Sequence, residues 1–180
     1  MRTATLIIVA YLMCVIVAAI WRLLPLDIAM HAIPDIGALT AAYLGLTSRK
    51  TLAPAVGGAV VIGYLVDVIS GGPSGLNALA LGFTGLVARA VQQRILVRGF
   101  AMTLGFSAFV AVVASIINLM IRGLYRVPGA SMGVELQHLA LGAVATALIG
   151  PLVWRAFRRV DAAFARTHRE RDAALEGLAP

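Results

Sequence analysis

An aspartate inside an apolar stretch is the first residue of this chain whose position indicates chemistry. Residues 63–79 read GYLVDVISGGPSGLNAL, which places Asp67 in sequence typical of a membrane helix. A charge in hydrocarbon costs about 2.5 to 3.5 kcal/mol, so we expect Asp67 to face other helices or a wet cavity. Residues 71–75 are rich in glycine and proline and cannot continue a helix. We therefore expect a turn there, with Asn77 opening the next helix.

Other polar residues could join Asp67 in a polar site at the outer face of the protein. Asp35 and Asn77 stand at the starts of apolar stretches, and Glu135 and His138 lie three residues apart at the start of another. Side chains three apart share one face of a helix. Two other interpretations are open. Asp67 could cap the amides of the following turn or helix, and Glu135 and His138 could simply be wetted at a helix end.

The sequence contains no recognisable catalytic set. Its three histidines lack zinc-site spacing, it has no phosphate loop, and the GxSxG-like stretch at residues 72–76 fails at Leu76. Asp35 and Asp67 lack the flanking motif of an intramembrane aspartyl protease. With Cys14 as the single cysteine, neither an intrachain disulfide nor a cysteine metal site can form. We predict a protein without enzymatic activity, cofactor or metal.

Composition predicts the elements that must position these residues. The 180 residues are 61% hydrophobic and 13% charged, against about 25% charged in soluble domains. The chain is therefore predicted to be an all-α polytopic membrane protein with one bundle of six transmembrane helices, each near the required length of about 20 residues. The predicted spans are residues 4–24, 28–46, 52–69, 76–97, 99–121 and 134–154.

The second span is the least regular of the six. Asp27, His31, Pro34 and Asp35 crowd its start. Because proline is tolerated in the first turn of a helix, the helix could instead begin at Pro34. Residues 26–33 would then form a surface or re-entrant segment.

The basic residues predict the orientation of this bundle. With both termini cytoplasmic, 12 of the 15 Lys and Arg residues fall on the inner side and three on the outer side. The positive-inside rule favours this arrangement and explains the net charge of +7 without a nucleic-acid partner. The inner residues are Arg2, Arg49, Lys50, Arg89, Arg94, Arg98, Arg155, Arg158, Arg159, Arg166, Arg169 and Arg171, and the outer ones are Arg22, Arg122 and Arg126.

Residues 155–180 are predicted to form a basic amphipathic tail after a transmembrane domain at 1–154. Phe157, Val160 and Phe164 share one apolar face beside several arginines. We expect this segment to extend the last helix and lie along the cytoplasmic leaflet. The alternative is a docking surface for a cytoplasmic partner.

Small residues recur at every fourth position on three of the predicted helices. Such stripes let helix backbones approach closely in lipid, so they predict packing within the bundle or docking of a partner's transmembrane helix. Asn118 continues one stripe and could hydrogen-bond across helices. The stripes are Ala10, Cys14 and Ala18; Ser107, Ala111 and Ser115; and Gly142, Thr146 and Gly150.

Residues 34–81 carry a spaced pattern of glycine, aspartate and leucine. Pro34-Asp35 precedes a helix ending in YLGL at 43–46. The residues after it follow a G-x-x-x-D-x-x-x-G-x-x-x-G-x-x-A-L pattern from Gly63 to Leu79. In these features the chain resembles the rod shape-determining MreD family, although its basic tail departs from the family pattern.

The resemblance implies a non-enzymatic inner-membrane scaffold of the bacterial cell-elongation (rod) complex, supporting cell shape and peptidoglycan synthesis. The partners it implies, besides the lipid bilayer, are an MreC-like bitopic protein and, through it, MreB, RodA and a class B penicillin-binding protein. We expect this chain to act through such contacts.

A second function follows from the same resemblance. The MreD family is similar in fold to the substrate-binding subunits of energy-coupling-factor vitamin transporters, which implies a small-molecule pocket facing outward. The stripe of Ala10, Cys14 and Ala18 resembles the face that those subunits present to their coupling protein. Against this alternative, aromatic residues form only 7% of the chain, whereas a vitamin pocket is expected to contain them. We favour the scaffold.

Overall fold

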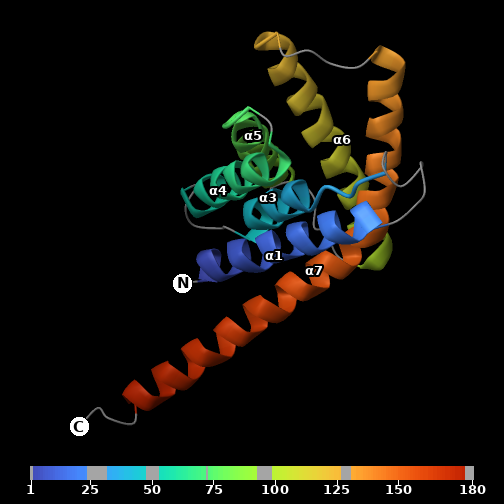
Figure 1. Ribbon diagram of the computed structural model, residues 1–180. Coiled ribbons are helices and arrows are strands. Elements are labelled where there is room, and N and C mark those ends of the chain that lie inside the picture. The colour runs from blue at the N-terminus through green and yellow to red at the C-terminus, as the bar shows by residue number, and fades with distance from the viewer. Residues whose placement is uncertain are drawn as a thin grey trace.

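The computed structural model describes residues 2–23, 32–47, 53–71, 73–92, 99–126 and 131–176, and all its regular elements there are α-helices (Figure 1). This confirms the predicted all-α class for the described residues. The helices are α1 (Arg2–Leu23), α3 (Ile36–Thr47), α4 (Ala53–Ser70), α5 (Leu76–Gln92), α6 (Phe100–Leu124) and α7 (Met132–Glu176).

Three of these helices are long and apolar enough to cross a membrane, over Arg2–Ile20, Phe100–Leu124 and Met132–Arg166. Helices α3, α4 and α5 are apolar but shorter. The 12 residues of α3 rise only about 18 Å, less than the hydrocarbon thickness of about 30 Å. The structure thus indicates a membrane protein, with three helices long and apolar enough to span a membrane and three shorter apolar helices.

The largest difference from the predicted spans is in the second one. Helix α3 begins at Ile36, after Pro34 and Asp35, as the alternative start at the proline anticipated. Residues 28–31 of the predicted span lie outside the described residues, as do residues 93–97 of the fourth.

Helix α3 lies at the centre of the fold. All its residues from Ile36 to Gly45 are buried, and it contacts α1, α4, α5, α6 and α7. Small side chains permit this crowding. A Cβ atom at Gly45 would lie 2.5 Å from the carbonyl oxygen of Gly85 in α5, closer than side chains tolerate. The central helix is therefore held by close backbone packing of the kind found in membrane bundles.

Successive helices run in opposite directions. Asp35 meets Thr146, and further along both helices Tyr43 meets Trp154 and Phe157, so α3 and α7 are parallel. Similar pairs of contacts orient the other helices. Gly58 meets Leu44 and Gly37 meets Val66, so α4 runs opposite to α3. Gly37 also meets Leu81 and Gly45 meets Ala88, so α5 runs parallel to α3. Ser107 meets Gly150 and Arg122 meets Glu135, so α6 runs opposite to α7. At one end of α1 Arg2 meets Asp161, and further along Cys14 lines the same cavity as Asp35 and Thr146, so α1 runs opposite to α3 and α7.

Large apolar side chains cover much of the outside. On α1, Ile8, Leu12, Ile16 and Ile20 recur at four-residue spacing, and each is about half exposed. A continuous apolar face of this kind is a liability in water and suits contact with lipid.

Helix α7 continues through the predicted end of the sixth span at Trp154. It contains Pro151, which removes a backbone donor and bends a helix, and Figure 1 shows α7 changing direction along its length. Phe157, assigned from sequence to the tail, is fully buried in the core beside Tyr43. The first turn of the predicted tail therefore packs against α3 in the core.

Candidate functional site

Asp67 caps the turn and the helix that follow it. Its side chain is 2% exposed, and its carboxylate accepts hydrogen bonds from the backbone N–H groups of Gly75 (2.8 Å), Asn77 (3.1 Å) and Ala78 (3.4 Å). The first N–H groups of a helix have no partner within it, so a carboxylate placed there satisfies them. The sequence left open whether Asp67 joins a polar site or caps the following turn and helix, and the structure shows the cap.

The α4–α5 hairpin around Asp67 depends on its glycines. A Cβ atom at Gly63 would lie 2.5 Å from both the carbonyl oxygen of Asn77 and the Cα of Ala78. Gly71 and Gly75 adopt φ angles of 66° and 98°, which other residues rarely adopt. The spacing of glycine and aspartate in residues 63–79 is therefore a physical requirement of this hairpin.

Asp35 caps α3 in a similar way. Its Oδ1 accepts the N–H of Ala38 at 2.7 Å, and its own N–H donates to the hydroxyl of Thr146 at 2.9 Å. The Thr146 hydroxyl in turn donates to the carbonyl oxygen of Gly142 at 2.7 Å. These bonds join the start of α3 to the middle of α7 and explain why α3 begins where it does.

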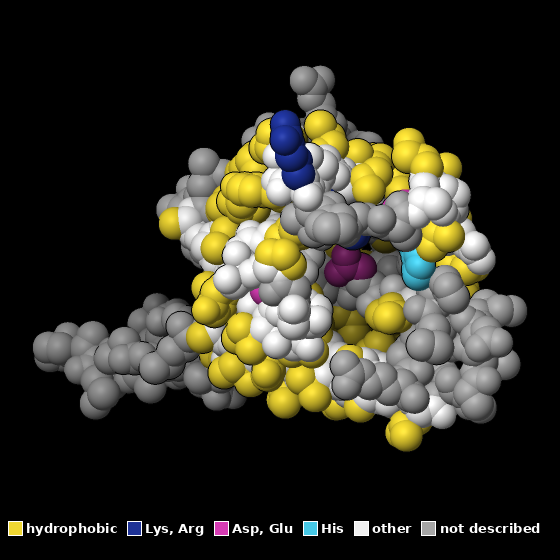
Figure 2. Space-filling model, turned by 45° about the horizontal axis from the view of Figure 1, so that its top comes forward, with side chains coloured by type: hydrophobic (Ala, Val, Ile, Leu, Met, Phe, Trp, Pro, Cys, Tyr) yellow, Lys and Arg dark blue, Asp and Glu magenta, His cyan; other side chains and the backbone are white. Residues whose placement is uncertain are grey.

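A cavity of about 810 Å³ lies between the helices, next to both caps. Residues from all six described helices and from the segment before α3 line it. Figure 2 shows a hollow containing an acidic side chain, with a histidine at its edge. Four of the five predicted polar residues line the cavity, namely Asp35, Asn77, Glu135 and His138. Asp67 is not among the lining residues.

Polar contacts join the helices around this cavity. The side-chain amide of Asn118 donates to the Oδ1 of Asn77 at 2.7 Å, the cross-helix bond predicted for Asn118. Arg122 and Glu135 form an ion pair of 3.3 Å between the end of α6 and the start of α7. The cavity therefore has amides, a cation, acids and an imidazole in its wall.

All three small-residue stripes face other helices of the same chain. Ala10 and Ser107 are fully buried, and a Cβ atom at Gly150 would overlap the side chain of Ser107. Other stripe residues face the cavity, namely Cys14, Ala18, Ala111, Ser115, Gly142 and Thr146. The stripes thus lie on the inward sides of their helices, and their predicted choice between packing within the bundle and docking of a partner helix stays a prediction.

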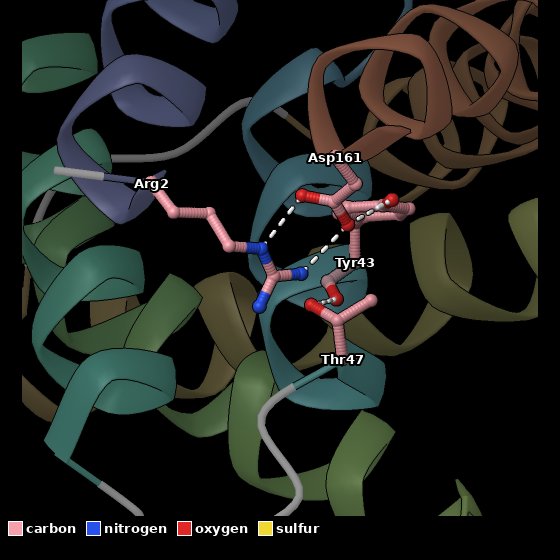
Figure 3. A network of polar contacts seen from close by, with 4 residues as sticks. All are labelled: Arg2, Tyr43, Thr47 and Asp161. Atoms are coloured by element: carbon pink, nitrogen blue, oxygen red, sulfur yellow. Dashed lines mark hydrogen bonds and ion pairs between the residues drawn. The ribbon is translucent and has the colours of Figure 1, made fainter. Parts of the chain in front are cut away.

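A polar network at the other end of α3 was not anticipated from the sequence (Figure 3). Arg2 donates to both carboxylate oxygens of Asp161, at 2.7 and 2.6 Å, and the Tyr43 hydroxyl donates to the same carboxylate at 2.7 Å. The hydroxyl of Thr47 donates to the carbonyl oxygen of Tyr43 at 2.8 Å. The only sequence signal was that Asp161 is the first acid in the predicted tail and follows three arginines, Arg155, Arg158 and Arg159.

We expect the Arg2–Asp161 pair to stabilise the fold modestly. Its side chains are 42% and 22% exposed, so solvent weakens the pair, and a double-mutant cycle of Arg2→Gln and Asp161→Asn should give a coupling of about 1 kcal/mol. Thermal unfolding in detergent measures this value. Arg159→Gln, at an exposed position on the same helix, is the control. A coupling of zero would contradict the network.

Among the described residues no cluster of three or more His, Cys, Asp or Glu side chains could hold a metal ion.

Compared with family models, with curated proteins and with solved structures, the chain gives no match.

Proposed function

We propose that this protein is a non-enzymatic scaffold subunit of the bacterial cell-elongation complex, similar to MreD, which acts by binding an MreC-like bitopic protein. The observation that carries the proposal is the hairpin of residues 63–79. Gly63, Asp67, Gly71 and Gly75 each have a distinct physical role in it. The resemblance therefore rests on residues that depend on one another rather than on isolated matches.

We infer further that the six helices form six membrane crossings with both termini in the cytoplasm. The alternating helix directions support this topology, because they bring the N-terminal end of α1 and the Asp161 region of α7 to the same end of the fold. The shortness of α3 is compatible with it, since Pro34 and the first residues of α3 are buried in protein, where irregular backbone is tolerated at membrane depth.

Cysteine labelling tests this topology in a Cys14→Ser background. A membrane-impermeant reagent added from outside should modify a cysteine at Ser74, an exposed turn position, or at Gly129, and should spare one at Thr51. Labelling after lysis provides the control for each site. If the reagent modified only the cysteine at Thr51, the protein would have the opposite orientation to the one proposed.

Co-purification tests the scaffold function. The protein, expressed in rod-shaped bacteria and extracted in mild detergent, should carry an MreC-like bitopic protein identified by mass spectrometry. Deletion of the gene should produce round cells that the parent sequence restores to rods. Purification with an ATPase module and a bound vitamin would contradict the scaffold.

The cavity is the observation that favours the alternative, a vitamin-binding transporter subunit. Its volume lies within the range of about 300 to 1,000 Å³ typical of small-molecule sites. However, none of the described residues that line it is Phe, Tyr or Trp. The scaffold remains the better-supported proposal.

A further inference from the structure

The wall of the cavity changes in polarity along α6 and α7. Toward the middle of the two helices its residues are small and uncharged, and include the hydroxyls of Ser115 and Thr146. Toward the ends that face each other, charged and polar residues lie among the apolar Leu119, Met132, Leu136 and Leu139. The inner residues are Ala111, Ala114 and Gly142, and the outer ones are Asn118, Arg122, Glu135 and His138. A ligand that matches this wall has one apolar part and one polar part.

The outer part of the cavity presents both signs of charge side by side. Arg122 and Glu135 are paired at 3.3 Å, and their side chains remain 30% and 21% exposed. A guanidinium has five donors and a carboxylate has about four acceptor positions, so the pair can also bind a ligand. A group that carries an anion and a cation together would complement it.

The apolar part of the wall suits flexible hydrocarbon. Its remaining residues are mainly aliphatic, such as Val17, Ile36, Val66 and Leu81, and no described lining residue is Phe, Tyr or Trp. The walls belong to helices whose outer faces carry exposed apolar side chains, so hydrocarbon chains surround the cavity in a membrane.

We propose that the cavity binds one zwitterionic aminophospholipid, with its headgroup at Arg122 and Glu135 and hydrocarbon against the aliphatic wall. The lipid phosphate accepts hydrogen bonds from Arg122, and the lipid ammonium donates to Glu135. The cavity wall shares Val66, Ile69, Ser70 and Asn77 with the 63–79 block, whereas the headgroup residues Arg122 and Glu135 lie outside that block.

Mass spectrometry of the intact protein tests the site. The full chain is reconstituted in vesicles of equal phosphatidylethanolamine and phosphatidylglycerol, extracted in mild detergent, and examined for retained lipid. We expect one retained phosphatidylethanolamine for each chain. Leu136→Trp should abolish retention, because Leu136 lines the cavity but is 59% exposed, so the larger ring obstructs the site without disturbing the core.

Two further variants make the result specific. Val144→Trp, on a 60% exposed position of α7 outside the cavity, should retain lipid as the parent does. Glu135→Gln should lower the ratio of retained phosphatidylethanolamine to phosphatidylglycerol by about fivefold, because the ammonium loses its charged acceptor. Equal retention by Leu136→Trp and the parent, or no retained lipid in the parent, would overturn the site. Equal retention of both lipids by the parent would overturn the headgroup assignment.

Discussion

Asp67→Leu is expected to lower the free energy of unfolding by about 3 kcal/mol, because it leaves three backbone N–H groups of the turn and of α5 without their acceptor. Asp67→Asn should cost only about 1 kcal/mol, since one carbonyl oxygen remains available to the same amides. Thermal unfolding of the purified proteins in one detergent measures both values. The amount of MreC-like partner that co-purifies should be highest for the parent, lower for Asp67→Asn and lowest for Asp67→Leu.

Val68→Ala is the matched control for Asp67. Val68 is the next residue of α4, and it is 63% exposed on the side of the helix that points away from the rest of the protein. This change should leave the unfolding temperature close to that of the parent. If Asp67→Leu unfolds at the temperature of this control, the cap contributes nothing to stability.

The sequence predicted the parts of the fold and site that depend on local patterns. The cost of a charge in hydrocarbon indicated that Asp67 must have polar partners. The helical spacing of Glu135 and His138 placed them on one face, and both line the cavity with Asp35 and Asn77. The spacing of the small residues also predicted the three stripes, because residues four apart lie on the same face of a helix.

The parts that depend on contacts between distant segments could not be predicted. Asp161 appeared as one acid within a basic tail, and only the packing of α7 against α1 and α3 brings it to Arg2 and Tyr43. Hydropathy likewise placed the end of the sixth span at Trp154, although Phe157 is fully buried beyond it. The sequence of a helix shows that one face is polar, but it does not show which distant segment packs against that face.

Gly150→Leu is expected to destabilise the bundle by about 3 kcal/mol, whereas Gly142→Leu should cost less than about 1 kcal/mol. The two glycines belong to the same stripe but differ in their surroundings. A side chain at Gly150 would overlap Ser107 of α6, whereas a Cβ atom at Gly142 would lie 3.6 Å from the carbonyl oxygen of Ile33, an ordinary contact. Thermal unfolding in detergent compares the two variants with the parent.

An exchange of the two contacting residues tests the cause of this loss. Gly150→Ser should destabilise the protein, and adding Ser107→Gly should restore part of its stability, because the side chain has then moved from α6 to α7 across the same contact. Recovery of an MreC-like partner is measured on the same samples. A Gly150→Leu variant that unfolds like the parent but loses the partner would assign this stripe to docking. Loss of stability in Gly150→Leu, with rescue in the exchanged pair, would instead assign it to the contact between α6 and α7.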